Sequence, residues 1–417
     1  NMSKKIDTYK GVRAFYPEDE RIQQYIFDIL STTSERFGYE PYHASILEPT
    51  ELYTEKTSEE IIKEQTYTFT DRGGRSVTLR PEMTPTVARM VANKKRELGF
   101  PLRWYSIPNC FRYERPQRGR LREFWQWNVD MFGAEGIAAD AEVIELAYST
   151  LKNFGATDDM FVIKIADRAL LETAFDACGM NDEQKRNYRQ LLDKKLKTTP
   201  EEFKKEALKI TEKDPIALIE GTDESVKELE CRTRDLVELL KERGVTNVEF
   251  DPSIVRGFDY YTGLVFEVYD TSGKNERSMF GGGRYDYLVE EYGGTATPAV
   301  GVAAGDVILR QFLETHDLLP ENRADTDLYL APADDTSTEN AAGAAAFLRE
   351  KGVNVALGMK HKKIADHIKA AGKLRIPYFA VYGEQEQNNG TLTIKTLETK
   401  EEQTIPLHDV PRSLGAV

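Results

Sequence analysis

The segment Arg122–Phe132 restricts the fold more than any other, because its side chains alternate between polar and apolar with a period of two. Such alternation is typical of a β-strand with one face in the core. The apolar set is Trp125, Trp127, Val129 and Met131. The opposite set is Arg122, Phe124, Gln126, Asn128 and Asp130. This second face is either the solvated outside of an antiparallel sheet or a surface that binds a ligand, and the alternation alone leaves both open.

A loop rich in arginine precedes this strand. It reads E-R-P-Q-R-G-R-L over Glu114–Leu121 and follows a strand-like segment, Cys110–Tyr113. The arginines in and beside the loop are Arg112, Arg115, Arg118, Arg120 and Arg122. Guanidinium groups match the geometry of phosphate oxygens. In a chain with a net charge of -14, this concentration of arginine indicates a site for several phosphates.

Two other segments carry polar side chains at places where the backbone is rigid. R-P-E-M-T, Arg80–Thr84, follows the expected strand Ser76–Arg80, and Thr84 with Pro85 predicts a capped helix start. Glu82 and Thr84 therefore either face a ligand or serve the helix end. The stretch R-G-F-D-Y-Y-T-G-L-V-F-E, Arg256–Glu267, combines charges, tyrosines and glycines, and is either a ligand site or a strand entry with an incidental ion pair.

The rest of the first 318 residues predicts a sheet flanked by helices. Apolar spacing indicates helices over Glu18–Phe37 and Ala139–Asn153. A lysine- and glutamate-rich helical insertion is expected at about 170–244. Phe280–Asp286 predicts a glycine-rich turn, and a helix is expected near Val300–Phe312.

A linker with Pro320 separates this part from the last hundred residues. We expect a first domain over 1–318, a linker over 319–325 and a second domain over 326–417. Strands and helices alternate in the second domain, which predicts a small α/β domain with parallel crossovers.

Composition excludes several classes of protein. No apolar run approaches the ~20 residues needed to cross a bilayer, so we expect no membrane span. The three cysteines lie far apart, and the histidines are scattered, which argues against a protein-held metal and favours a reducing, cytoplasmic location. The net negative charge argues against a general nucleic-acid coat but permits one basic face.

Four segments together resemble the histidyl-tRNA synthetase family of class II aminoacyl-tRNA synthetases. They are R-P-E-M-T, the arginine-loop segment Phe111–Gln126, R-G-F-D-Y-Y-T-G (Arg256–Gly263) and G-G-R-Y-D (Gly282–Asp286). The resemblance implies an α+β fold with a class II antiparallel sheet flanked by helices and an anticodon-binding α/β domain at the end. It implies a homodimer that ligates L-histidine to tRNA(His) through a histidyl-adenylate, using ATP and Mg²⁺.

The same resemblance assigns roles to residues. Arg112 and Arg256 would be catalytic and bind ATP, together with Glu114 and Arg120. The histidine pocket would contain Glu82, Thr84, Gln126, Asp130, Tyr260, Tyr261 and Tyr285. The tRNA acceptor end would meet Arg115, Gln117 and Arg118. The metal would be held mainly by ATP.

Two positions depart from the family pattern. The third motif of the family ends in G-L-E-R, whose arginine holds the γ-phosphate, but here Gly305–Ile308 contains none. Arg310 lies nearby, at an offset that would turn it to another helix face. Ser45 replaces a proline of the dimer-forming first motif. The missing arginine favours an alternative, a catalytically silent histidine-binding paralogue that regulates a histidine-biosynthesis enzyme. The arginine loop and the second domain favour the ligase.

Overall fold

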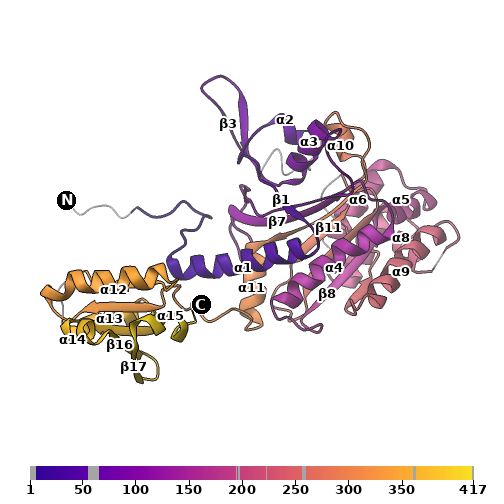
Figure 1. Ribbon diagram of the computed structural model, residues 1–417. Helices are drawn as coiled ribbons and strands as arrows, with labels where there is room; N and C mark the ends of the chain where they lie inside the picture. The colour runs from indigo at the N-terminus through magenta and orange to yellow at the C-terminus, as the bar shows by residue number, and fades with distance from the viewer. Residues whose placement is uncertain are drawn as a thin grey trace. The chain divides into compact units, whose positions relative to one another are not determined.

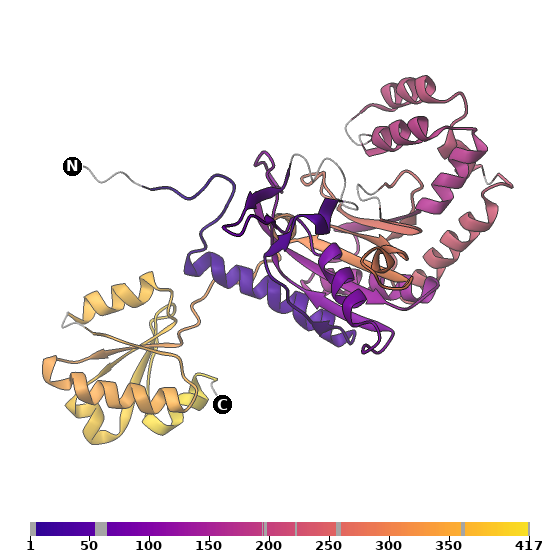
Figure 2. The same ribbon diagram turned by 90° about the horizontal axis from the view of Figure 1, so that it is seen from above.

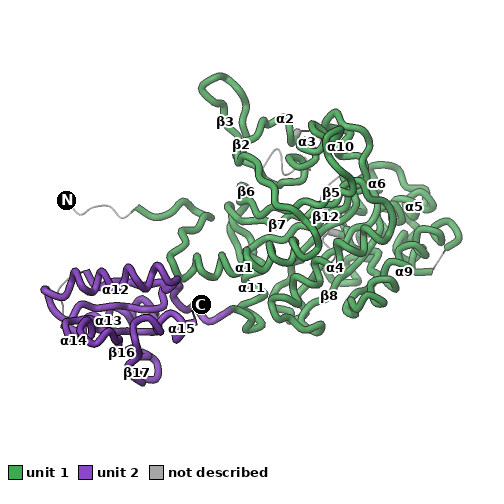
Figure 3. The backbone as a smooth tube through the Cα atoms, viewed as in Figure 1, with its two compact units in different colours: residues 1–319 green, residues 320–417 purple. Residues whose placement is uncertain are grey.

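The computed structural model describes residues 6–54, 65–193, 195, 198–221, 223–255, 260–359 and 363–415. The chain divides into two compact units, residues 1–319 and 320–417 (Figure 3). None of the described helices is long and apolar enough to cross a membrane.

A large, mainly antiparallel sheet forms the centre of the first unit (Figure 1). Among the described residues its strands lie in the order β1-β5-β7-β12-β11-β10-β8-β9, and β6 pairs with β7. The two outermost pairs, β1 with β5 and β8 with β9, are parallel. The bounds are β1 Glu40–Pro41, β5 Leu102–Ser106, β6 Asn109–Phe111, β7 Glu123–Phe132, β8 Phe161–Asp167, β9 Val248–Phe250, β10 Leu264–Asp270, β11 Phe280–Arg284 and β12 Ala299–Gly305.

One face of this sheet packs against long helices. The apolar side chains of β7, including Trp127 and Val129, are buried in one cluster with residues of these helices, such as Ile26 and Ile144. The helices are α1 Pro17–Arg36, α4 Ile137–Asn153, α9 Lys227–Glu242 and α11 Asp306–Thr315. The period of two in β7 thus reflects a face in the core, as expected.

A second apolar cluster joins α3 (Thr84–Lys94) and α10 (Leu288–Glu291) to Tyr260, Tyr261 and Tyr285. A small sheet of β2 (Leu47–Pro49), β4 (Ser76–Leu79) and β3 (Tyr67–Thr70) leads into α3, with α2 (Glu51–Thr54) after β2. The segment that ends this small sheet therefore positions Glu82 and Thr84.

Between β8 and β9 the described residues form helices, over the range predicted for a helical insertion. Figure 2 shows these helices gathered at one end of the first unit. They are α5 Arg168–Ala177, α6 Asp182–Asp193, α7 Pro200–Ile210 and α8 Pro215–Glu220, followed by α9. Leu170, Phe175 and Tyr188 belong to a core of their own.

The second unit is a five-stranded α/β domain within its described residues, with strand order β14-β13-β15-β16-β17. The strands β14, β13 and β15 are parallel, and β16 and β17 add antiparallel. The strands are β13 Leu328–Pro332, β14 Val355–Leu357, β15 Tyr378–Tyr382, β16 Thr391–Thr396 and β17 Glu402–Pro406. The helices are α12 Thr338–Glu350, α13 Ile364–Lys373, α14 Glu384–Asn389 and α15 Val410–Ser413.

Three local predictions were wrong. Phe280–Arg284 is not a turn but β11, in the middle of the large sheet. The first half of Val300–Phe312 is strand β12, and the helix α11 begins only at Asp306. Thr84 does not cap α3, because it is already the first helical residue and Met83 precedes it without a side-chain cap.

Candidate active site

A small polar cavity lies over the centre of the large sheet. Its volume is about 30 Å³, and residues from the Arg80–Thr84 segment, β7, β11, β12 and the segment with Tyr260 and Tyr261, here called the tyrosine segment, line it together with Tyr285. The lining residues are Glu82, Thr84, Gln126, Asn128, Asp130, Tyr260, Tyr261, Gly281, Tyr285, Gly301, Val302 and Ala303. All seven residues predicted for the histidine pocket are therefore brought together, from segments far apart in the sequence.

Asp130 is the most unusual group in this cavity. It is 4% exposed, and its Oδ1 accepts a hydrogen bond from the Tyr285 hydroxyl. Its Oδ2 is buried and has no hydrogen-bond partner among the described residues. Burial raises the pKa of Asp130 to about 7, although the Tyr285 hydrogen bond lowers it. An acceptor buried without a partner is costly, so this oxygen is a candidate to accept a hydrogen bond from a ligand.

Three tyrosines form the wall beside Asp130. The Tyr260 ring centroid lies 4.9 Å from that of Tyr261 and 5.7 Å from that of Tyr285. The Tyr260 hydroxyl donates to Glu82 Oε2 at 3.2 Å, which ties the tyrosine segment to the Arg80–Thr84 segment. A flat apolar wall between two buried carboxylates suits a flat ring that carries N–H groups.

Hydrogen bonds of Arg284 and Asp286 hold the segments that carry Tyr261 and Tyr285. Arg284 donates to Asp140 Oδ1 from Nε at 2.8 Å and to Asp286 Oδ1 from Nη1 at 3.1 Å. Asp286 Oδ2 in turn accepts from the Thr262 hydroxyl at 3.2 Å. The residues on either side of Tyr285, Arg284 at the end of β11 and Asp286, are thus joined to Thr262, next to Tyr261.

A larger cavity of about 170 Å³ adjoins the first. Gln126, Gly281 and Ala303 line both, so the two are continuous. The remaining lining residues are Arg112, Glu114, Gly119, Arg120, Leu121, Phe124, Ser278, Met279, Phe280, Gly305, Val307 and Ile308. Below, this second space is called the arginine cavity.

Arg112 is held in the arginine cavity by its inner nitrogen. Nε donates to the Pro81 carbonyl at 2.9 Å, and the guanidinium lies 5.3 Å from the centre of the Phe124 ring. No other hydrogen bond or ion pair of Arg112 occurs among the described residues, which leaves the terminal nitrogens for a ligand. Arg120 pairs with Glu114 at 2.6 Å, so that pair lines the same space.

The loop between β6 and β7 carries some residues that line the arginine cavity and others that are exposed outside it. Gln117 and Arg120 exchange backbone hydrogen bonds of 2.9–3.0 Å across a tight turn, where Gly119 has φ +75°. Glycine suits this conformation because it has no Cβ. Arg115, Gln117 and Arg118 are exposed and line neither cavity, whereas Arg120 returns to the arginine cavity.

The floor beneath both cavities consists of glycine and alanine on β11 and β12, opposite the polar face of β7. In register, Gly301 pairs with Asp130, Ala303 with Asn128 and Gly305 with Gln126. A Cβ atom at Gly301 would lie 2.8 Å from the Val129 carbonyl oxygen and closer still to Asp130 Oδ1. This glycine floor leaves room for a ligand, and it also buries Asn128 and Asp130 instead of leaving them solvated.

Sequence reasoning missed part of the site. Asn128, Gly281, Gly301 and Ala303 line the small cavity without having been assigned to it. The signal available was the position of Asn128 on the polar face of its strand, and the alternation of small residues in Ala299–Gly305. Arg256 lies outside the described residues, so its predicted role stays a prediction.

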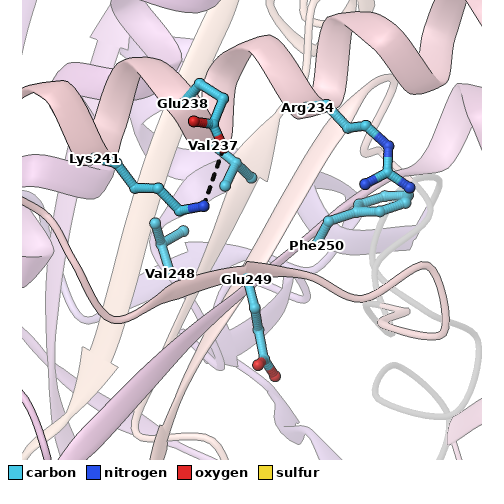
Figure 4. A pocket seen from close by; sticks show the side chains of 7 residues that line it. All are labelled: Arg234, Val237, Glu238, Lys241, Val248, Glu249 and Phe250. Carbon is cyan, nitrogen blue, oxygen red and sulfur yellow. Dashed lines mark hydrogen bonds and ion pairs between the residues drawn. The ribbon is translucent and has the colours of Figure 1, made fainter.

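Another cavity lies elsewhere, between α9 and β9 (Figure 4). Its volume is about 360 Å³, but each of its charged side chains has an oppositely charged partner, which for Arg234 is Glu230 and for Glu249 is Lys164. Lys241 pairs with Glu238 at 3.0 Å, and the Arg234 guanidinium lies 5.2 Å from the Phe250 ring centre. Nothing in it is buried and unpartnered, so its size alone does not indicate a binding site.

The described residues contain no group of three or more His, Cys, Asp or Glu side chains that could hold a metal ion. Glu114 is the one carboxylate among the described residues that line the arginine cavity. Mg²⁺ in nucleotide sites commonly binds one or two carboxylates and the phosphates of the substrate. The residues present fit a magnesium ion that arrives with a nucleotide.

Comparison with known proteins covers nearly the whole chain. A family model described as histidyl-tRNA synthetase matches residues 11–306, and one described as anticodon binding domain matches residues 327–416. A histidine–tRNA ligase of Leptospira biflexa is 39% identical over 413 residues, which are 95% of this chain and 94% of that protein.

Solved structures share the fold. The histidyl-tRNA synthetase of Nostoc sp. PCC 7120 matches with a TM-score of 0.80 and 21% identity, covering 99% of each chain. A Bacillus halodurans protein described as an ATP phosphoribosyltransferase regulatory subunit/histidyl-tRNA synthetase matches with a TM-score of 0.71 and 24% identity, covering 92% of this chain and 98% of that one. At these identities the structural likeness establishes the fold and does not separate the two activities.

Proposed function

The chain belongs to the histidyl-tRNA synthetase family and has the activity of a histidine–tRNA ligase, and on that premise we propose how its two cavities divide the reaction. The histidine binds in the small cavity, and ATP binds in the arginine cavity. The observation that carries this proposal is the buried, unpartnered Oδ2 of Asp130, in a space continuous with one lined by arginines.

The imidazole of histidine lies against the tyrosine wall. Asp130 Oδ2 accepts from one ring N–H, and Glu82 lies in the same cavity as a second acceptor. Thr84 and Gln126 line the cavity on the sides of the α3 start and β7 and bind the amino acid's polar groups. An amino acid without N–H donors leaves the carboxylate unpaired, and sites of this kind discriminate by roughly 10⁴-fold or more without editing.

The arginine cavity positions ATP. The terminal nitrogens of Arg112 bind the α-phosphate, and Arg120 with Glu114 positions the rest of the nucleotide. The histidine carboxylate attacks the α-phosphorus, the bond from that phosphorus to the bridging oxygen breaks, and pyrophosphate leaves. Mg²⁺, held mainly by ATP, would offset phosphate charge. Positioning and cationic stabilisation dominate such reactions, and one well-placed donor contributes roughly 3–4 kcal/mol.

Arg256 is proposed as a second catalytic cation on the α-phosphate. Changing Arg256→Ala is expected to reduce the adenylation rate severely while leaving the affinity for histidine nearly intact. Pyrophosphate exchange and equilibrium binding of histidine measure the two quantities separately. A large loss of histidine affinity would contradict this assignment.

Transfer to tRNA(His) uses surfaces outside the two cavities. We propose that the exposed Arg115, Gln117 and Arg118 bind the acceptor end, since they stand on the loop that borders the arginine cavity. The second unit matches the anticodon-binding family over residues 327–416. We further propose a homodimer in the cytoplasm, on the strength of the family resemblance.

The test of this proposal is histidine-dependent ATP–pyrophosphate exchange. Exchange that requires histidine and Mg²⁺ is expected. Histidine binding without exchange would instead support a silent regulatory paralogue, and absence of both would overturn the assignment of the cavities.

A further inference from the structure

The third-motif arginine of the family is replaced here by an apolar side chain. Ile308 stands at the matching position and lines the arginine cavity. Arg310, the nearest arginine along the helix, points elsewhere: its Nη2 donates to Asp19 and its Nε to Glu314, both at 2.9 Å. Within the described part of α11, therefore, no arginine is directed to the cavity.

Arg277, which does not belong to α11, is a cation beside the arginine cavity. It precedes β11 and is the neighbour of Ser278, which lines the arginine cavity. A Cβ atom built on Gly119 would lie 3.2 Å from Ile308 Cδ1 and 4.0 Å from Arg277 Cδ. Both side chains thus flank the same turn of the arginine loop. Arg277 is half-buried and makes no hydrogen bond or ion pair with any described residue.

We propose that Arg277 binds the terminal phosphates of ATP in place of the third-motif arginine. The inference rests on the placement of ATP in the arginine cavity proposed above. It names a residue outside every motif that the family resemblance supplies, and it explains how this chain tolerates Ile308.

The electrostatics around Arg277 agree with this role. Burial lowers the pKa of Arg277, and the nearby Arg120 lowers it further. The nearby Glu114 raises the pKa of Arg277. Glu114 is already paired with Arg120. Two guanidinium groups therefore lie near each other with one carboxylate nearby, and a bound polyphosphate would relieve their repulsion.

The first experiment compares two nucleotides that differ in their phosphates. Binding of α,β-methylene-ATP and of AMP is measured by calorimetry, with Mg²⁺, on the full chain and on Arg277→Ala. The variant is expected to bind α,β-methylene-ATP about 10- to 100-fold more weakly, as for the loss of hydrogen bonds to a charged group. Its affinity for AMP should be unchanged. In exchange assays the KM values for ATP and pyrophosphate should rise, and the KM for histidine should not.

The matched control is Arg310→Ala, which removes an arginine from the adjacent helix and should leave both affinities at the wild-type value. Restoring the family residue provides a second control. In the double variant Arg277→Ala/Ile308→Arg, part of the lost affinity for α,β-methylene-ATP should return.

Several outcomes would overturn the inference. Equal losses for AMP and α,β-methylene-ATP would show that Arg277 only orders the arginine loop. Unchanged nucleotide binding with a raised KM for tRNA would assign Arg277 to the nucleic acid. If the wild-type chain bound no α,β-methylene-ATP, or bound it unaffected by Arg112→Ala, the placement of ATP itself would fail.

Discussion

Burial makes the ionised form of Asp130 costly to the folded protein, and the substitution Asp130→Asn should reveal that cost. The amide keeps the shape of the side chain and can still accept from the Tyr285 hydroxyl. It removes the buried charge and the acceptor at Oδ2. We therefore expect a variant that is more stable without ligand and that binds histidine poorly.

The size of the effect follows from the pKa. A rise from 3.8 to about 7 corresponds to roughly 4 kcal/mol, at about 1.36 kcal/mol per pKa unit. The pKa of Asp130 is higher in the folded state than in the unfolded state. The wild-type protein is therefore stabilised at low pH, where this carboxyl is protonated. This advantage is full below about pH 4 and is lost as the pH rises through 7. Leaving the new amide N–H₂ unpaired costs about 1–3 kcal/mol. The net gain at pH 8 should be roughly 1–3 kcal/mol.

The assay is urea unfolding of ligand-free protein at pH 5 and pH 8, followed by tryptophan fluorescence. All three tryptophans lie in the first unit, so the signal reports the unit that contains Asp130. The stability of Asp130→Asn relative to wild type should be lower at pH 5 than at pH 8 by roughly 2–3 kcal/mol. Asp235→Asn, exposed on α9, is the control and should change little at either pH.

Histidine binding supplies the second half of this test. Asp130→Asn should weaken it about 10- to 100-fold, as for a lost hydrogen bond to a charged group. A variant whose stability relative to wild type did not depend on pH would refute the buried ionised carboxyl. Unchanged histidine affinity would refute its role as the imidazole acceptor.

Three further substitutions test other parts of the site. Arg112→Ala should lower the rate of pyrophosphate exchange by roughly 10²- to 10³-fold with little change in histidine affinity, and a simple rise in the KM for histidine would contradict its placement. Gly301→Ala should destabilise the first unit by about 1–3 kcal/mol and abolish histidine binding, because the new methyl meets Val129 and Asp130. Its control, Gly343→Ala on α12, meets no atom within 4 Å and should stabilise the second unit by up to about 1 kcal/mol in thermal unfolding. Arg118→Ala should raise the KM for tRNA in aminoacylation and leave exchange unchanged; a defect in exchange would place Arg118 in the ATP site.

The elements that sequence reasoning predicted well are those with a clear local pattern. The strand Glu123–Phe132 and the helix Pro17–Arg36 have a period that one segment displays by itself. The convergence of Glu82, Asp130 and Tyr285 followed from the family resemblance, because no local pattern relates segments so far apart.

The elements that were wrong owe their conformation to neighbours. Three successive glycines favour a turn when considered locally, yet Gly281–Gly283 form a central strand. A Cβ atom at Gly282 would lie 2.8 Å from Phe266 Cε1 and closer to the Gly301 carbonyl oxygen. Glycine is required there by close approach across the sheet, not by a turn. The apolar Ala299–Gly305 likewise fits a strand or a helix until its partners β7 and β11 are known.

The glycine floor has a consequence for inhibition. A compound that rests on Gly281, Gly301 and Ala303 would touch a surface built largely from main chain. At Gly301 a Cβ atom would collide with the Val129 carbonyl oxygen and with the Asp130 carboxylate, which we propose as the acceptor for histidine. A substitution at Gly301 that displaced such a compound would therefore be expected to impair the enzyme as well.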